Sequence, residues 1–67
     1  MANEFVRKEA REKGVHLWEI AAELGISDVA FSKQLRFEFD RRKVDRIVGI
    51  IDDVATRKAM EDPGNES

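Results

Sequence analysis

Residues 17–36 read LWEIAAELGISDVAFSKQLR, and this stretch decides the fold. Apolar residues recur at helical spacing on both sides of Gly25, which predicts two short helices, over 17–24 and 28–36. Glycine tolerates the positive φ that ends a helix in a sharp turn, and the hydroxyl of Ser27 can cap the second helix. The pattern therefore predicts two helices joined by one tight turn.

Three side chains suit the contact between these two helices. Ala21 is small enough to let the helices approach closely, and Ile26 and Phe31 can fill the wedge between them. Phe31 and Leu35 are four residues apart, so they form one buried stripe on the second helix. This layout is a helix-turn-helix, whose second helix lies across the outside of the domain and can enter the major groove of DNA.

Two further helices are predicted on either side of the motif. Residues 3–13 alternate charge with a thin apolar set, with Asn3 placed to cap the start of a helix and Gly14 placed to end it. Residues 41–60 form the longest helix, with Asp40 as its cap. The apolar residues of this helix fall in two adjacent rows, one through Val44, Val48, Ile51 and Ala55 and one through Ile47, Ile50 and Val54.

The whole pattern predicts an all-α protein, a compact bundle of four helices (about 3–13, 17–24, 28–36 and 41–60) that contains the helix-turn-helix. Residues 1–60 form a single domain, and residues 61–67, EDPGNES, have the composition of a disordered acidic tail. A core of this size is marginal, so well-packed helices or a partner subunit are the usual supports.

Aromatic residues outside the predicted core stripes give two further expectations. Trp18 lies at the edge of the inner face of helix 17–24 and is expected to pack against helix 41–60 or helix 3–13; the alternative is a partly exposed anchor for another protein. The segment Phe37-Glu38-Phe39 breaks the helical pattern, so we interpret it as a loop with one or both rings folded inward.

Composition argues against catalysis, metal binding and a membrane location. The chain has no cysteine, one histidine and no glycine-rich phosphate loop, so neither a nucleophile with its base nor three converging metal ligands are expected. We expect no cofactor and no small-molecule substrate. No stretch approaches the roughly 20 apolar residues of a membrane span, and nothing resembles a signal peptide. These features predict a cytoplasmic protein that is not an enzyme.

The net charge of -2 counts against nucleic-acid binding when taken alone. Residues 1–51, however, carry ten of the 12 Lys/Arg and nine of the 14 Asp/Glu, a net charge of +1, which leaves -3 for residues 52–67. DNA binding requires a local basic surface rather than a basic average. The cluster Arg41-Arg42-Lys43 at the start of helix 41–60 can bind a phosphate together with the free N–H groups of that helix; the alternative is a solvated surface without a role.

Residues 14–36, GVHLWEIAAELGISDVAFSKQLR, resemble the helix-turn-helix of the Xre/Cro/C1 repressor family. The resemblance lies in a glycine followed by an apolar residue, then Glu19, an apolar residue and Ala21, then Leu24-Gly25-Ile26-Ser27. More loosely, residues 3–60 resemble small helix-turn-helix proteins of phages and mobile elements of Gram-positive bacteria. The resemblance implies a compact all-helical fold, sequence-specific binding of double-stranded DNA and often dimerisation.

The resemblance also implies which residues contact DNA, because in that family the start of the second helix of the motif reads bases. Asp28 can accept a hydrogen bond from cytosine N4 but repels phosphates, and Val29 can contact only a thymine methyl group. Specificity is therefore expected to rest on later residues of helix 28–36. With the basic cluster included, the predicted DNA-binding residues are Ser27, Asp28, Val29, Ala30, Ser32, Lys33, Arg36, Arg41, Arg42 and Lys43.

Two hypotheses for function follow. The leading one is a small repressor-like transcription regulator of phage or mobile-element type that binds double-stranded DNA with helix 28–36 in the major groove. One small helix reads few base pairs, so a homodimer through helix 41–60, at the face of Ile50 and Val54, is a candidate. The alternative is a protein-interaction module on a helix-turn-helix scaffold without DNA binding, which the net negative charge and Asp28 favour.

Overall fold

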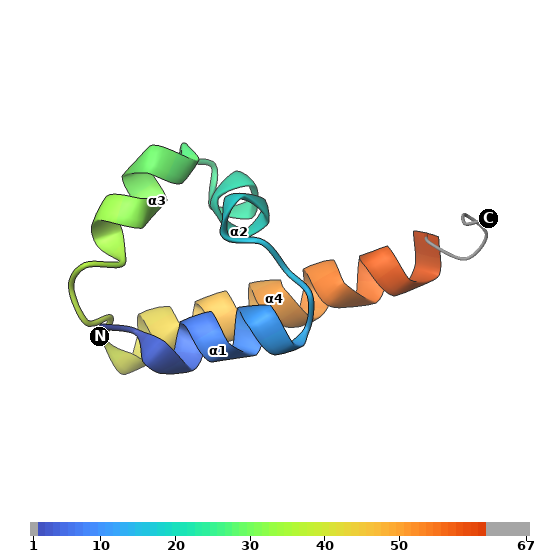
Figure 1. Ribbon diagram of the computed structural model, residues 1–67, viewed down its shortest axis with the longest axis horizontal. Coiled ribbons are helices and arrows are strands. Elements are labelled where there is room, and N and C mark those ends of the chain that lie inside the picture. Colours follow the sequence, from blue (N-terminus) through green and yellow to red (C-terminus); the bar gives the residue numbers. More distant parts are fainter. Residues whose placement is uncertain (1, 62–67) are drawn as a thin grey trace.

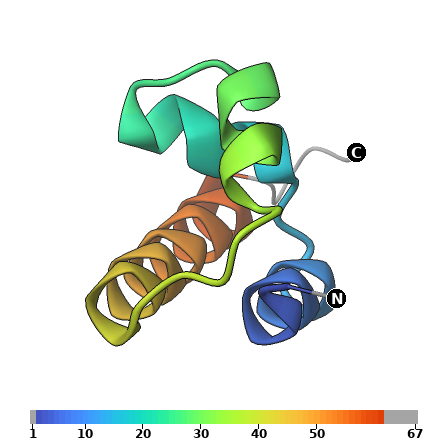
Figure 2. The ribbon, with the colours of Figure 1, turned by 90° about the vertical axis from the view of Figure 1, so that its left-hand side faces the viewer.

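The computed structural model describes residues 2–61, within which the chain forms four α-helices and no strand (Figure 1). The helices are α1 (Glu4–Glu12), α2 (Leu17–Leu24), α3 (Asp28–Gln34) and α4 (Arg41–Glu61). Figure 2 shows α1 and α4 side by side and nearly end-on, with α2 and α3 packed across them on one side. The predicted all-α bundle of four helices is confirmed.

The helix boundaries agree with the predicted ranges to within two residues. The largest difference is at the end of α3, where the N–H groups of Arg36 and Phe37 bond to carbonyl oxygens three residues back, both at 3.2 Å. Such tightened turns are frequent at helix ends, and they shorten the α-helical part. Of the tail predicted over 61–67, Glu61 ends α4, and residues 62–67 lie outside the described part of the chain.

Short-range signals in the sequence set the ends of these helices. The Ser27 hydroxyl accepts a hydrogen bond from the backbone N–H three residues on, at 3.0 Å, and the Asp40 carboxylate does the same at 2.8 Å. Gly14 and Gly25 have φ of 70° and 78° and follow the last turns of α1 and α2. The predicted caps and glycine stops at these four positions are confirmed.

Asn3 does not cap α1 as predicted. Its side chain makes no cap bond, its φ is 61°, and it is buried. Its Nδ2 donates to the carbonyl oxygens of Leu35 and Phe37, both at 2.9 Å, and its Oδ1 accepts from the N–H of Phe39 at 2.8 Å. The prediction was wrong because a cap is inferred from nearby residues, whereas these partners lie 32 to 36 residues away. Asn3 thus joins the start of α1 to the loop between α3 and α4.

The hydrophobic core lies between the α1–α4 pair and the α2–α3 pair. Phe31 and Leu35 are each 1 % exposed and anchor α3 on this core, as their spacing predicted. Every helix contributes to the core, and its largest fully buried apolar side chains are Phe31, Ile20, Leu35, Ile47, Ile51 and Val6. Their burial holds the helix-turn-helix rigidly on the other two helices.

The row of α4 through Ile50 and Val54, predicted as a dimer surface, packs within the molecule instead. Val54 is only 6 % exposed, and Ile50 is half-buried against the same core. Because α4 contacts both α1 and α2, it needs an apolar arc wider than one contact would require. Val54 is therefore buried within the chain and Ile50 is left partly exposed, and a homodimer through α4 stays a prediction.

Of the three aromatic residues outside the predicted core stripes, Phe39 folds inward, whereas Phe37 and Trp18 are exposed. Phe39 folds inward, with its ring centroid 6.3 Å from that of Phe31, whereas Phe37 is 75 % exposed. Trp18 is 57 % exposed and stacks on the His16 ring, with centroids 6.2 Å apart. Trp18 was expected to pack against a neighbouring helix; it borders α4 residues Val54 and Arg57, but its side chain stays more than half exposed.

Candidate nucleic-acid interface

The turn of the helix-turn-helix presents α3 at a steep angle to α2. In Figure 1, α2 is seen nearly end-on while α3 runs across the view. Ala21 is 1 % exposed where the helices meet, and the N–H of Ile26 bonds to its carbonyl oxygen at 3.0 Å. Ile26 is half-buried against the core. The predicted roles of the small, turn and wedge residues are confirmed, and together they fix the direction of α3.

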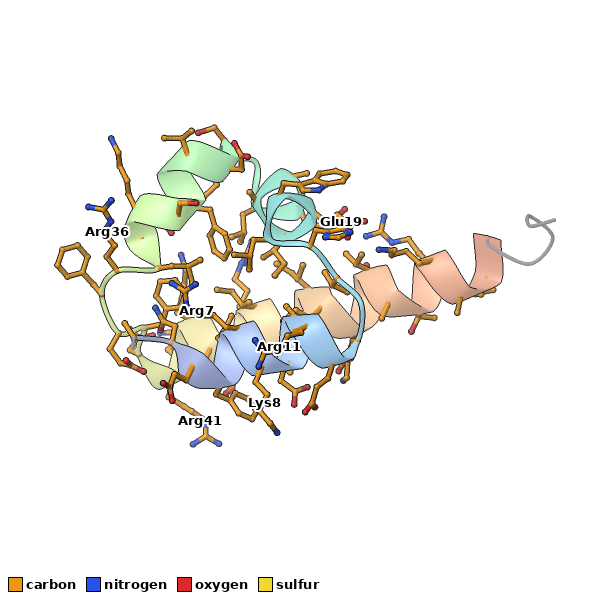
Figure 3. The ribbon with its side chains drawn as sticks, viewed as in Figure 1. Arg7, Lys8, Arg11, Glu19, Arg36 and Arg41 are labelled. Atoms are coloured by element: carbon orange, nitrogen blue, oxygen red, sulfur yellow. The ribbon has the colours of Figure 1, made fainter. Side chains whose placement is uncertain are left out.

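The outward side of α3 forms a continuous exposed surface. Its five exposed residues lie on α3 or directly after it, and we call them the α3 face: Asp28, Val29, Ser32, Lys33 and Arg36. Val29 is 62 % exposed, and Figure 3 shows Arg36 projecting away from the rest of the molecule just past the end of α3. The structure therefore brings five of the predicted DNA-binding residues together on one side.

Two other predicted residues at the start of α3 act mainly in the fold. The Ser27 hydroxyl is engaged as the helix cap, where it accepts the N–H of Ala30. Ala30 is itself half-buried. These residues position the α3 face rather than extend it.

The predicted basic cluster at the start of α4, residues 41–43, does not form one patch. Successive residues of a helix are rotated by about 100°, so the three side chains diverge. Arg41 pairs with the carboxylate one turn on at 3.3 Å, and Figure 3 shows it on the opposite side of the α1–α4 pair from Arg36. Lys43 lies over the Phe39 ring, 5.6 Å from its centroid. The helix start therefore does not concentrate positive charge beside α3.

Ion pairs between helices occupy the other end of the molecule. They connect α4 to α1 and α2, and they join Lys58 to Glu19 at 3.0 Å, Arg57 to Glu23 at 2.9 Å, and Lys13 to Asp52. The hydrogen bond to Asp52 raises the pKa of Lys13 above its ordinary value, against a smaller opposing effect of desolvation. Lys13 and Arg57 also pair with Glu9 and Asp53, respectively, so five carboxylates share three cations and this end stays acidic.

Glu19 connects α2 to α4 through its charge. Its carboxylate accepts the N–H of His16 at 2.8 Å, which satisfies a free donor at the start of α2. This bond and the nearby Lys58 ammonium hold the pKa of Glu19 below its ordinary value, against the opposing effect of partial burial. His16 occupies the cap position of α2, as expected for a polar residue before a helix. Glu19 thus stays charged at neutral pH and fixes the helix-turn-helix on α4.

The remaining cations have no carboxylate partner within residues 2–61. Apart from the two on the α3 face, they are Arg7, Arg11, Arg42, Lys43 and Arg46. Most lie on α1, α3 and the first part of α4, away from the ion-paired end. Cations without an ion pair in the described part are therefore present despite the net charge of -2, and they include Arg42 and Lys43 of the predicted cluster as well as residues outside it.

Arg7 and Arg11 are functional candidates that sequence reasoning missed. They lie one turn apart on α1 and line an open pocket of about 540 Å³ with His16 and Leu17 at the start of α2 (Figure 3). Arg7 donates a hydrogen bond to the carbonyl oxygen of Ala2 at 3.2 Å and makes no ion pair in the described part. One signal was present: neither arginine has an acidic residue four positions before or after it.

Comparison with known proteins finds no relative for this chain: no protein-family model, curated protein or solved structure matches it. Across residues 2–61, no group of three or more His, Asp or Glu side chains could hold a metal ion. Within the same range, no helix has the length and apolar character needed to cross a membrane. Function is therefore inferred from the geometry of the chain itself.

Proposed function

We propose that the protein binds double-stranded DNA in a sequence-specific manner, with α3 in the major groove, as a small transcription regulator of phage or mobile-element type in the cytoplasm. The α3 face carries the proposal. It is the outward side of the second helix of a helix-turn-helix, and Phe31 and Leu35 anchor its opposite side in the core. The major groove of B-DNA is wide enough to admit an α-helix with such a surface.

Within the α3 face, the residues have distinct roles. Lys33 and Arg36 can donate hydrogen bonds to guanine O6 and N7 or to phosphates, and the Ser32 hydroxyl can pair with either kind of base edge. Val29 offers an apolar contact to a thymine methyl group, and Asp28 accepts from cytosine N4 while disfavouring close phosphates. The first turn thus limits which bases fit, and the later residues supply most of the attraction.

Arg7 and Arg11 extend the proposed interface to the phosphate backbone. A guanidinium group matches a phosphate with two parallel hydrogen bonds, and both groups lie beside the start of α2 without a carboxylate partner among residues 2–61. Each such contact steepens the decrease of log affinity with log salt concentration by about 0.9. Two contacts from α1 would therefore add attraction to the phosphate backbone and make the affinity for DNA more dependent on salt.

Mobility-shift titrations of single variants test the proposal. Lys33→Ala and Arg36→Ala should each weaken binding to a duplex that the wild type recognises, by about 1–3 kcal/mol for a lost base contact. Lys8→Ala is the matched control, since Lys8 is an exposed α1 cation that lies outside the α3 face and pairs with Glu12 at 3.4 Å. If both α3 variants bind as tightly as Lys8→Ala, then α3 does not read DNA.

A second candidate function is a protein-interaction module on the same scaffold, and the exposure of Trp18 favours it. This ring is 57 % exposed and lines a pocket of about 200 Å³ with Val54 and Arg57 of α4. Tryptophan is over-represented among the residues that dominate protein interfaces. If the wild type shows no affinity for any duplex at low salt, and Trp18→Ala abolishes capture of a protein partner, this function replaces DNA binding.

A further inference from the structure

The loop between α3 and α4 holds one aromatic ring outside the core and another inside it. Phe37 is 75 % exposed, whereas Phe39 packs its ring against that of Phe31, with centroids 6.3 Å apart. An exposed phenyl ring adds little to the stability of the chain, because its apolar surface remains in water. Burial in the core therefore explains a phenylalanine at position 39 but not at position 37.

The backbone that carries Phe37 is fixed on both sides. Its N–H bonds to the carbonyl oxygen of Gln34 at 3.2 Å, and its own carbonyl oxygen accepts from Asn3 Nδ2 at 2.9 Å. Leu35 before it is 1 % exposed, and the N–H of Phe39 after it bonds to Asn3 Oδ1 at 2.8 Å. Binding through a residue on such a backbone orders little additional chain, which favours affinity. The fold thus presents the ring from a fixed position.

Positive charge borders this position. Arg36 directly precedes the ring and projects away from the molecule (Figure 3), and Lys43 lies over the other ring of the loop, 5.6 Å from its centroid. Neither cation has a carboxylate partner within residues 2–61. Both acidic side chains of the loop accept backbone N–H groups, Glu38 at 3.1 Å and Asp40 at 2.8 Å. These surroundings suit a polyanion that also offers apolar groups.

We propose that Phe37 contacts a thymine methyl group in the major groove and is a further specificity-determining residue, beside the α3 face. The inference rests on the proposed DNA binding by α3. The C5-methyl group of thymine is the apolar feature of the major groove, and phenylalanine is among the side chains that contact it. Val29 and Phe37 are eight positions apart, which is about 12 Å along a helix. Because base pairs are stacked about 3.4 Å apart, the two side chains reach different base pairs.

A deoxyuridine scan of a duplex that the wild type selects tests the inference. Each thymine in turn is replaced by deoxyuridine, which removes only the C5-methyl group, and affinity is measured by mobility shift. The wild type should lose about fourfold in affinity at the position that Phe37 contacts, the effect of one buried methylene-sized group. Phe37→Ser should bind thymine and deoxyuridine equally at that position and remain sensitive at the others.

Phe5→Ser is the matched control. Phe5 is a 56 % exposed aromatic residue of α1, and it lines an open space with Arg41, which Figure 3 places across the α1–α4 pair from Arg36. This variant should keep the deoxyuridine profile of the wild type. Both variants should retain the helical circular dichroism signal, because both rings are more than half exposed.

Two results would overturn the inference and leave DNA binding by α3 intact. One is a wild type that binds its duplex and that no single deoxyuridine weakens. The other is a Phe37→Ser variant with the deoxyuridine profile of the wild type, whether or not its affinity falls uniformly. If the wild type binds no duplex, the proposed DNA binding fails, and this inference fails with it.

Discussion

At the scale of single residues, Asn3 connects parts of the chain that no other polar side chain described here brings together. Its side-chain amide donates to the carbonyl oxygens of Leu35 and Phe37 and accepts from the N–H of Phe39, all in the segment that leads from α3 to α4. A fourth bond joins the Asn3 N–H to the Glu38 carboxylate at 3.1 Å. Because Arg36 lies within the segment that Asn3 holds, this residue positions part of the α3 face without contacting it directly.

Asn3→Ala should lower the free energy of unfolding by about 3 kcal/mol. The substitution removes the buried amide and leaves its backbone partners without hydrogen bonds, and each buried group left unpaired costs about 1–3 kcal/mol. Urea denaturation measures this change. Asn3→Gly is the control, because glycine keeps the positive φ at little cost and loses only the side-chain bonds. The alanine variant should be the less stable of the two by about 1 kcal/mol. An alanine variant as stable as the wild type would contradict this role.

Single residues could be predicted from the sequence where their partners are close along the chain. Gly25, Ser27 and Asp40 act on backbone groups within a few positions, so their residue types were sufficient evidence. The role of Asn3 and the exposure of Trp18 were not predicted because the surroundings of both residues depend on distant segments. Burial and long-range hydrogen bonding require the tertiary structure.

At the scale of helices, substitution by alanine should have opposite effects on stability at the glycine in α4 and at the glycine in the α2–α3 turn. Gly49 lies exposed in the middle of α4, and an added Cβ would meet nothing within 4 Å. Gly49→Ala should therefore stabilise the protein by up to about 1 kcal/mol through helix propensity. Gly25 also has open space, but its φ of 78° is strained for alanine, so Gly25→Ala should destabilise by about 1 kcal/mol.

Thermal denaturation of the two alanine variants compares these effects directly. A rise in melting temperature for Gly49→Ala and a fall for Gly25→Ala is the expected pair of results. A loss of stability in Gly49→Ala would mean that the middle of α4 is not a regular exposed helix.

The helices themselves were predictable, because apolar periodicity identifies each of them and caps mark their ends. What an apolar or basic surface of a helix contacts was not predictable. The wide apolar arc of α4 suggested a dimer surface at Ile50 and Val54, yet α1 and α2 of the same chain cover it. The arginines of α1 looked like ordinary solvated charges until the fold placed Arg7 and Arg11 beside the start of α2.

At the scale of the whole molecule, the proposed DNA binding has to be compatible with a net charge of -2, and the distribution of charge bears on this. Ion pairs between helices occupy the end that holds the last part of α1 and the second half of α4. Cations without carboxylate partners in the described part lie mainly on α1, α3 and the start of α4. The pairs stabilise the arrangement of the helices, while the unpaired cations are available to phosphates.

Selection of bound sequences from a random pool of DNA duplexes, at low salt, tests the central claim most directly. The wild type should enrich one short sequence motif, Lys8→Ala should enrich the same motif, and the double variant Lys33→Ala/Arg36→Ala should lose the enrichment. The variants differ only in which exposed cations they lack, so this pattern would assign recognition to α3. If the wild type enriches no sequence, or if the double variant enriches the same motif as strongly, the α3 face is not a reader of DNA.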